Sequence, residues 1–307
     1  MTKLILLTAS VCYVSVINTL LINAIPINNS SDEKLIYLCG GESDGSDQSY
    51  CYHYSALSRE WHTIPDMSTY RANFGLVSLN NKLYAISGTT NWWKRDTVEV
   101  YDPITDSWHQ LSNVIFTRGS FGTAVLNNAI YVCGGKNGEE YFVCESYIPE
   151  ANKWTASTPL TVRRSGLGLV ALGNHLYAIG GNGLNSMERF DSQSKQWTPM
   201  AANMSAKTRS WFGSAVFMDK IYVCGGHDGS DSKSCESYDP ITNKWTSIAS
   251  MLSKRIDFQL VALDNFLYAL GGFMDHENTN TVEVYDYKLN QWQYTQSLPH
   301  NCSAFAV

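Results

Sequence analysis

The sequence predicts an all-β protein, a six-bladed β-propeller with four antiparallel strands in each blade. Two observations lead to this fold class. Short apolar runs that end in a glycine pair, or once in Ser-Gly, occur six times, and a tryptophan follows 16 to 20 residues after each second glycine. The second glycines are 47, 47, 46, 45 and 46 residues apart, at Gly41, Gly88, Gly135, Gly181, Gly226 and Gly272. A period of this length and regularity is typical of a repeat architecture.

Each period contains four β-type runs, which in the third period cover residues 121–126, 130–133, 144–147 and 153–155. Asn127-Asn128 separates the first two runs and predicts a tight hairpin turn. The glycine pair and Asn137-Gly138 separate the second run from the third, and they supply the positive φ angles that such loops need. No stretch shows a sustained helical period. The four runs are therefore expected to form one propeller blade, with the repeated Tyr and Trp side chains filling the space between blades.

The first and last periods complement each other. The array opens at residues 35–39, which correspond to a second strand with no first strand before it. Residues 301–307 read like the first strand of the other periods. The C-terminal strand is therefore expected to complete blade one and close the ring, which leaves no sheet edge open at the seam.

The glycine pair, the Tyr-Asp step and the tryptophan, in this order, resemble the kelch repeat over residues 34–307. The chain is most similar to the kelch domain of the animal kelch-like (BTB-kelch) adaptor proteins, and this resemblance implies a protein-binding module. Ser87 and Ile148 depart from the pattern, which has glycine and aspartate there. Because 33 residues precede the first blade, we expect no BTB or BACK domain and no adaptor role. The sharpest copy of the repeat comprises residues 221–229, residues 235–240 and Trp245.

Residues 1–24 have the features of a secretory signal peptide. Lys3 precedes an apolar run over residues 4–22, and Ala24 offers a small residue for cleavage. Residues 25–33 would then form a short polar lead-in to the propeller. The alternative is an uncleaved membrane anchor, because the run approaches the length of a span. We expect a secreted, extracellular protein with no membrane attachment after cleavage, glycosylated at Asn203 and at Asn28.

Six cysteines fall two to a blade in blades one, three and five, at the end of the second strand and the start of the third. The even blades carry aliphatic residues or methionine at both positions, so the two positions change together, as contacting residues would. We therefore expect three disulfides and an oxidising compartment. A duplicated two-blade unit with free thiols is the alternative, and the remaining Cys302 leaves a Cys39–Cys302 disulfide open. The expected pairs are Cys39–Cys51, Cys133–Cys144 and Cys224–Cys235.

A basic residue stands just before the first strand of each blade. By ring symmetry these residues would form a circle around the channel on one face, where their field would be focused. The resemblance implies that the arginines line a partner-binding face, and a guanidinium group can hold a carboxylate at two points. The alternative is a structural role, in which each arginine binds loop carbonyls or an acid of a neighbouring blade. The expected partner-binding residues are Arg71, Arg118, Arg164, Arg209, Arg255 and His300.

Three of the nine tryptophans lie outside the repeat position. Trp92 and Trp93 stand in the loop after the glycine of blade two, and Trp211 follows Arg209. Exposed tryptophan and arginine are the residues that interface hot spots favour, so we expect these three tryptophans to anchor a partner. The alternative is that their rings fold back onto their own loops.

Composition and motifs narrow the function classes. The net charge is −6 and no basic run occurs, which argues against nucleic acid as a partner. No catalytic motif and no zinc-type histidine spacing occurs, so we expect neither an enzyme nor a cofactor or metal. We expect a monomer that binds a protein partner through an acidic segment, with a host-directed effector as one hypothesis. Because some kelch propellers bind actin, and a secreted bacterial sialic-acid mutarotase is one too, actin binding and an enzyme acting on a carboxylated sugar are the alternatives.

Overall fold

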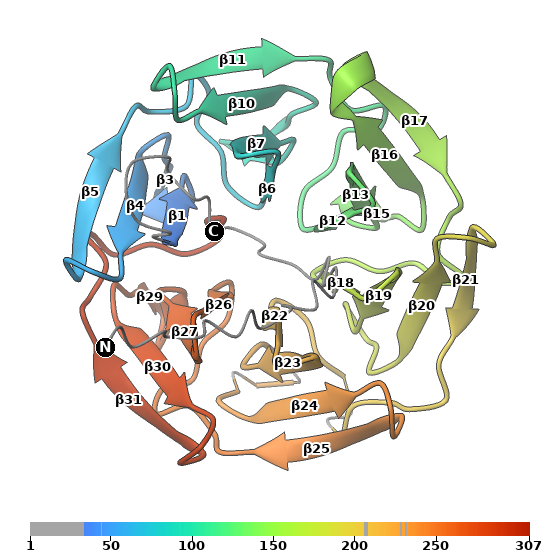
Figure 1. Ribbon diagram of the computed structural model, residues 1–307, viewed down its shortest axis with the longest axis vertical. Helices are drawn as coiled ribbons and strands as arrows, with labels where there is room; N and C mark the ends of the chain where they lie inside the picture. The colour runs from blue at the N-terminus through green and yellow to red at the C-terminus, as the bar shows by residue number, and fades with distance from the viewer. Residues whose placement is uncertain (1–33, 44, 92, 206–207, 228, 231) are drawn as a thin grey trace, which may run out of the picture.

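The computed structural model describes residues 34–307 apart from residues 44, 92, 206–207, 228 and 231, and forms a closed ring of six blades around a central channel (Figure 1). Blades two to six are four-stranded antiparallel sheets whose strands follow chain order from the channel outward. The predicted fold class is therefore confirmed. Because blade-to-blade packing repeats around the ring, the loops of all blades gather at its two ends.

The same order of strands, from the innermost to the outermost, recurs in blades two to six. Blade two contains β6 (Gly75–Leu79), β7 (Lys82–Ile86), β10 (Val98–Asp102) and β11 (Ser107–Leu111). Blade three contains β12 (Gly122–Leu126), β13 (Ala129–Cys133), β16 (Cys144–Ile148) and β17 (Lys153–Ser157), with the short helix η1 (Pro149–Ala151) before β17. Blade four contains β18 (Gly168–Leu172), β19 (His175–Ile179), β20 (Met187–Asp191) and β21 (Gln196–Pro199). Blade five contains β22 (Gly213–Phe217), β23 (Lys220–Cys224), β24 (Cys235–Asp239) and β25 (Lys244–Ile248). Blade six contains β26 (Gln259–Leu263), β27 (Phe266–Leu270), β30 (Val282–Asp286) and β31 (Gln291–Thr295).

Blade one is built from both ends of the described chain. β1 (Leu35–Cys39), β4 (Cys51–Ser55) and β5 (Glu60–Ile64) form a three-stranded sheet. The C-terminal segment, which lies beside β1 in Figure 1, supplies the innermost position. Cys39 and Ala306 exchange two backbone hydrogen bonds, of 3.0 and 3.2 Å. The C-terminal segment therefore closes the ring as predicted, although it pairs with β1 through this one residue rather than through a five-residue strand.

The loop between the second and third strands folds into a small hairpin in four blades. These loops lie at the same end of the molecule as the connections between blades, and we call this end the hairpin face. The opposite end carries tight turns, such as the predicted one at Asn127 and Asn128, whose φ angles are 50° and 60°. The small hairpins are β2 (Glu42–Ser43) with β3 (Ser46–Asp47), β8 (Thr89–Thr90) with β9 (Trp93–Lys94), β14 (Lys136–Asn137) with β15 (Glu139–Glu140), and β28 (Phe273–Met274) with β29 (Glu277–Asn278).

The hydrophobic core lies between the blades rather than within them. Among the described residues, six apolar clusters each join two neighbouring blades. In the cluster between blades two and three, the rings of Tyr147 and Trp154 are 5.1 Å apart. The Trp154 indole N–H donates to the carbonyl oxygen of Ser112 in blade two at 3.0 Å. The predicted filling of the space between blades by Tyr and Trp is therefore confirmed, and the pair of Tyr147 and Trp154 both packs between these two blades and tethers them.

Candidate functional site

A closed ring of six backbone hydrogen bonds surrounds the channel just below the hairpin face. Each connection between blades contributes one residue, whose N–H donates to the carbonyl oxygen of its counterpart in the preceding blade at 2.8–3.2 Å. All six residues have φ between 50° and 61°, in the left-handed region. This conformation costs a non-glycine residue about 1–3 kcal/mol, so the surrounding bonds must hold it in place. The ring consists of Asn73, Ser120, Gly166, Trp211, Asp257 and Ala304.

The channel opens onto the hairpin face through a cavity of about 250 Å³, which we call the mouth. Its walls come from the ring and from the small hairpins of blades one, two and three. Among the described residues, five charged side chains line it: Glu42, Asp47, Lys94, Lys136 and Asp257. Because several charged groups converge on this concave surface, it is a candidate site for a polar or charged ligand group.

The two lysines of the mouth lie close enough to influence each other. Burial and the neighbouring charge of Lys136 lower the pKa of Lys94. The ammonium of Lys136 also lies 6.0 Å from the centre of the Trp211 ring, within the range of a cation–π contact. This side of the mouth is therefore positively charged and carries one aromatic surface.

The acidic residues of the mouth have different surroundings. Asp47 accepts a hydrogen bond from the backbone N–H of Asn91 at 2.6 Å, which joins the hairpins of blades one and two. Burial, and to a lesser extent the charge of Glu42, raise the pKa of Asp257 to about 7, against the opposing effect of Lys136. Asp257 is therefore poised to change its protonation state near neutral pH.

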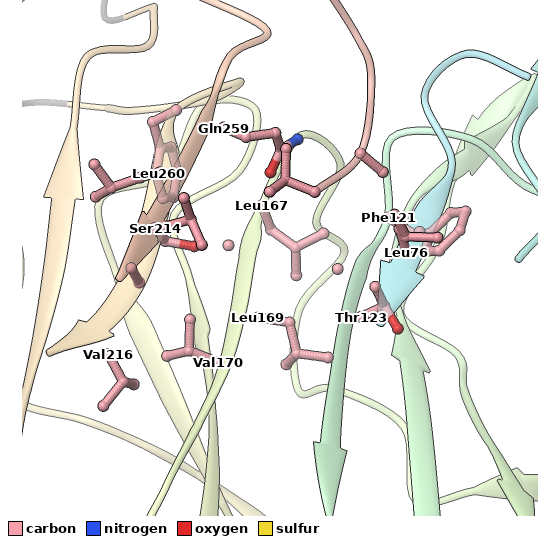
Figure 2. Close-up of a pocket in the computed structure, with 18 of the residues that line it drawn as sticks. Leu76, Phe121, Thr123, Leu167, Leu169, Val170, Ser214, Val216, Gln259 and Leu260 are labelled. Atoms are coloured by element: carbon pink, nitrogen blue, oxygen red, sulfur yellow. The ribbon is translucent and has the colours of Figure 1, made fainter. Parts of the chain in front are cut away.

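Below the ring, the channel is lined by the inner strands, and most of the lining side chains are apolar. A pocket of about 160 Å³ is formed by side chains such as Leu76, Leu169 and Leu260, together with the hydroxyl group of Ser214 (Figure 2). The inner strands approach so closely that a Cβ atom at Gly122 would lie 2.4 Å from the Cβ of Leu169. No charged side chain of the described residues lines this pocket. The mouth, rather than the channel interior, is therefore the candidate site.

The structure corrects the predicted arginine circle. Each of the five arginines is at most 1% exposed and points into the blade that it precedes, where it forms an ion pair of 2.8–3.1 Å with the glutamate of the third strand. Each guanidinium group also donates to two carbonyl oxygens of that blade; Arg118, for example, donates to Gly134 and Val143. The prediction that these side chains face the channel is wrong, because their donors are used inside the blade. The pairs are Arg71–Glu99, Arg118–Glu145, Arg164–Glu188, Arg209–Glu236 and Arg255–Glu283.

Blade one has neither member of this ion pair. Cys302 occupies the arginine position, because its carbonyl oxygen accepts a hydrogen bond from Gly272 of the preceding blade, as each arginine carbonyl does from its preceding blade. Tyr52, at the second position of β4, replaces the glutamate. His300, which was predicted to be the sixth basic residue, lies two residues earlier and packs on Tyr52 with 5.4 Å between ring centres. Burial raises the pKa of the Cys302 thiol to about 12, so blade one carries no ionised pair here.

The three non-repeat tryptophans have different positions. Trp93 lies on β9 next to Lys94, which lines the mouth, and 75% of the Trp93 surface is exposed. Trp211 belongs to the hydrogen-bonded ring and lines the mouth, with its ring 6.3 Å from that of His227. Trp92 lies outside the described residues. Of the predicted anchors, Trp93 and Trp211 are thus close to one cavity.

The predicted cysteine pairs form disulfides, with S–S distances of 2.09, 2.00 and 2.07 Å for Cys39–Cys51, Cys133–Cys144 and Cys224–Cys235. In each pair the two residues lie directly opposite in the register of the second and third strands. Cys302 is free and buried, so the alternative Cys39–Cys302 pairing is not formed.

Other predicted features concern the surface and the termini. Asn203 is exposed between β21 and β22, where a glycan would have room, whereas Asn28 and the expected signal peptide lie outside the described residues. Over the part of the chain that the structure describes, no group of three His, Cys, Asp or Glu side chains could hold a metal ion. The same residues include no helix long and apolar enough to cross a membrane.

The fold and the mouth define a six-bladed propeller that presents a loop-lined binding face. The family model of the kelch motif matches residues 70–114, 117–161, 163–204, 208–252 and 254–299, which correspond to blades two to six. The chain therefore belongs to the kelch repeat family, whose propellers generally serve as protein-interaction modules.

Known relatives resemble the chain over its propeller. Kelch-like protein 41a of Danio rerio is 26% identical over 280 residues, which cover 88% of this chain and 39% of the relative. Kelch-like protein 35 of Mus musculus is 34% identical over 120 residues, which cover 39% of this chain and 20% of the relative. The chain thus spans well under half the length of these curated relatives. A solved structure, that of YjhT, shares the fold with a TM-score of 0.74 at 16% identity, over 90% of this chain and 97% of the other.

Sequence reasoning missed most of the charged residues of the mouth. Glu42 and Lys136 directly follow a glycine pair, and Asp257 stands two residues after a buried arginine. Lys94 stands beside Trp93 in the unusual loop of blade two. Three of these residues occupy two fixed positions of the repeat, the residue after the glycine pair and the second residue after the arginine. A comparison of the repeats at these two positions could have identified them.

Proposed function

We propose that this protein is a secreted kelch propeller that binds a protein partner through its hairpin face. The observation that carries the proposal is Trp93, which exposes 75% of its surface on the hairpin face, next to Lys94 of the charged mouth. Water is a poor environment for so large an apolar ring, and exposed tryptophans next to a concave polar site are typical of binding hot spots. The kelch relatives support a protein partner.

The experiment compares the wild type with Trp93→Ala in capture of a partner from extracellular fluid. We expect Trp93→Ala to weaken capture by about tenfold or more with an unchanged melting temperature, because hot-spot aromatic residues contribute to binding rather than to folding. Ile104→Ala is the matched control: Ile104 is 93% exposed in the same blade, on the turn after β10 at the opposite end. Equal capture by wild type and Trp93→Ala would exclude the hairpin face of blade two as the interface.

Secretion is supported by the three disulfides, since such bonds persist in oxidising compartments, and by the apolar run of residues 4–22. Expression of the full chain in cells with a secretory pathway tests it. We expect the protein in the medium, with an intact mass that corresponds to a chain beginning at Ile25. Retention in the membrane fraction with residues 1–24 still attached would favour the anchored alternative.

An enzyme acting on a carboxylated sugar is a second candidate, favoured by the size of the mouth and by its two lysines. Its direct test is the rate at which the anomers of a carboxylated sugar interconvert, followed by NMR with and without the protein. An unchanged rate would set this candidate aside. Actin binding, the other alternative, is tested by cosedimentation with actin filaments.

A further inference from the structure

We propose that the mouth is a carboxylate-binding site, in which Lys94 and Lys136 together hold one acidic side chain of the partner. This inference rests on the proposed function, since it takes the ligand to be part of a protein. In this proposal the positive charge at the channel comes from two lysines of different blades and not from the buried arginines.

Gly119 lies next to both lysines, to Lys136 through backbone hydrogen bonds and to Lys94 through its ammonium group. Lys136 and Gly119 exchange backbone hydrogen bonds of 3.0 and 3.2 Å, which fix the start of β14 beside the connection into blade three. From the other side, the Lys94 ammonium reaches the same glycine: a Cβ atom at Gly119 would lie 3.2 Å from Lys94 Nζ. Both lysine side chains are partly buried. The absence of a side chain at Gly119 therefore leaves room for the Lys94 ammonium at this edge of the mouth, while the Lys136 ammonium reaches toward the Trp211 ring.

Neither lysine has a counter-ion within the described residues. Lys34, Lys82 and Lys220 each lie within 4.0 Å of an aspartate carboxylate, whereas no such pair involves Lys94 or Lys136. Burial and the neighbouring positive charge act together to disfavour the charged form of Lys94. An anion placed between the two ammonium groups would relieve both effects, and this gives the site a physical reason to bind one.

The rest of the mouth indicates what kind of anion fits. Glu42, Asp47 and Asp257 line the same mouth and would repel a large polyanion, which favours a ligand with a single carboxylate near the lysines. Asn73 and Ser120 offer further polar contacts, and the Trp211 ring offers an apolar surface for the methylene groups of a side chain. A cavity of about 250 Å³ accommodates a side chain with little more than its own backbone. These features favour a glutamate or aspartate in an extended segment.

The test uses three probes: the peptide Ac-Gly-Glu-Gly-Glu-Gly-NH2, its Gln counterpart, and glutarate. Binding to the full chain is measured by isothermal titration. We expect the acidic peptide to bind and the Gln peptide not to bind. Lys94→Ala/Lys136→Ala should weaken binding of the acidic peptide by at least about tenfold, since hydrogen bonds to charged groups are the strong ones. The control Lys153→Ala/Lys244→Ala removes the same charge from exposed positions on β17 and β25 and should leave binding unchanged.

Several results would overturn the proposal: equal affinity of the two peptides, equal affinity of the wild type and Lys94→Ala/Lys136→Ala, or no saturable binding of either carboxylate probe up to about 10 mM. Lysine-dependent binding of glutarate alone would support the anion site but assign it to a free small molecule. The melting temperature of the lysine variant should not fall, because no ion pair is lost. Loss of partner capture by Trp93→Ala without loss by the lysine variant would leave the proposed function standing and the carboxylate site refuted.

Discussion

Arg118 and Glu145 form an ion pair inside blade three, with 2.8 Å between Nη2 and Oε1 and no exposure of either side chain. Glu145 also accepts a hydrogen bond from the backbone N–H of Ile115 at 2.7 Å. The pair thus fastens the connection from blade two onto the sheet of blade three. Its counterparts do the same in blades two, four, five and six, so these five ion pairs belong to the framework of the propeller rather than to its binding surface.

Removing one member of this pair should be strongly destabilising. Arg118→Met leaves a buried carboxylate without its cation, and we expect the free energy of unfolding to fall by about 3–5 kcal/mol. Arg118→Met/Glu145→Gln should cost less than the sum of the two single variants, because it leaves no unpaired charge. Urea denaturation of the four proteins measures the coupling. Arg163→Met, which removes an exposed arginine 3.9 Å from Glu139, is the control and should change stability by less than about 1 kcal/mol. Strict additivity would contradict the interpretation.

The disulfides of the odd blades can be replaced by residues that the protein itself uses elsewhere. Ile86 and Val98 occupy in blade two the positions of Cys133 and Cys144 in blade three. Cys133→Ile/Cys144→Val should therefore keep the packing and lose only the cross-link, at a cost of about 2–3 kcal/mol under non-reducing conditions. In reducing buffer, the variant and the wild type should unfold at the same denaturant concentration. A difference that persists in reducing buffer would indicate a packing defect instead.

Closure of the ring depends on the aromatic side chain of Phe305. This residue is 1% exposed and packs with Leu38 of blade one and Leu270 of blade six. Phe305→Ala should lower the free energy of unfolding by about 3–5 kcal/mol, because it opens a cavity at the seam. Tyr294→Ala, at a site 56% exposed on β31, is the control and should have a small effect. Equal stability of Phe305→Ala and the wild type would show that the seam does not need this contact.

Asp257 should make stability depend on pH in an unusual direction. Its pKa in the folded state is about 7, above the value near 3.9 of an unfolded chain, so the folded state binds the proton more tightly. The contribution is therefore complete below about pH 4 and is lost as the pH rises to about 7. Glu42 faces Asp257 as a like charge and Lys136 as an opposite one, while Asp47 and Lys94 line the same mouth.

Asp257→Asn removes this pH-dependent contribution to stability. The variant should lose stability less steeply than the wild type between about pH 5 and about pH 8, by no more than about 4 kcal/mol in total. Denaturant titrations of both proteins at these two pH values measure the difference. Parallel pH profiles would mean that the carboxyl group titrates at its ordinary value.

Much of this architecture follows from the sequence because the repeats compare the chain with itself. The glycine pairs and tryptophans predicted the blades, and the joint change of both cysteine positions predicted that those residues touch. The sequence also contains the correspondence between Cys302 and the arginines, because Cys302 stands ten residues after Trp292, as Arg118 stands ten residues after Trp108. The charge pattern favours His300 as the sixth basic residue, because its side chain is basic. The backbone hydrogen bond from Gly272 to Cys302 shows instead that Cys302 corresponds to the arginines.

The direction of the arginine side chains could not be taken from their spacing. Ser120, two positions after Arg118, has a positive φ and turns the chain. In the folded structure this turn leaves Ser120 lining the mouth and the Arg118 side chain inside the blade. The glutamates indicate a structural role for the arginines, because the position of Glu145 is a glutamate in five blades and is Tyr52 in the one blade that lacks the arginine. The lysine pair needed the structure, because Lys94 and Lys136 come from different blades and line one mouth only in the folded ring.

The ring around the channel has the same backbone in all six blades and a different amino acid in each: asparagine, serine, glycine, tryptophan, aspartate and alanine. The fold therefore sets where these side chains stand but does not choose them. Substitutions at the ring can change the shape and charge of the mouth without disturbing the ion pairs or the cores between blades. The specificity of the mouth can in this way change one residue at a time, although a ring residue such as Asp257 also affects stability.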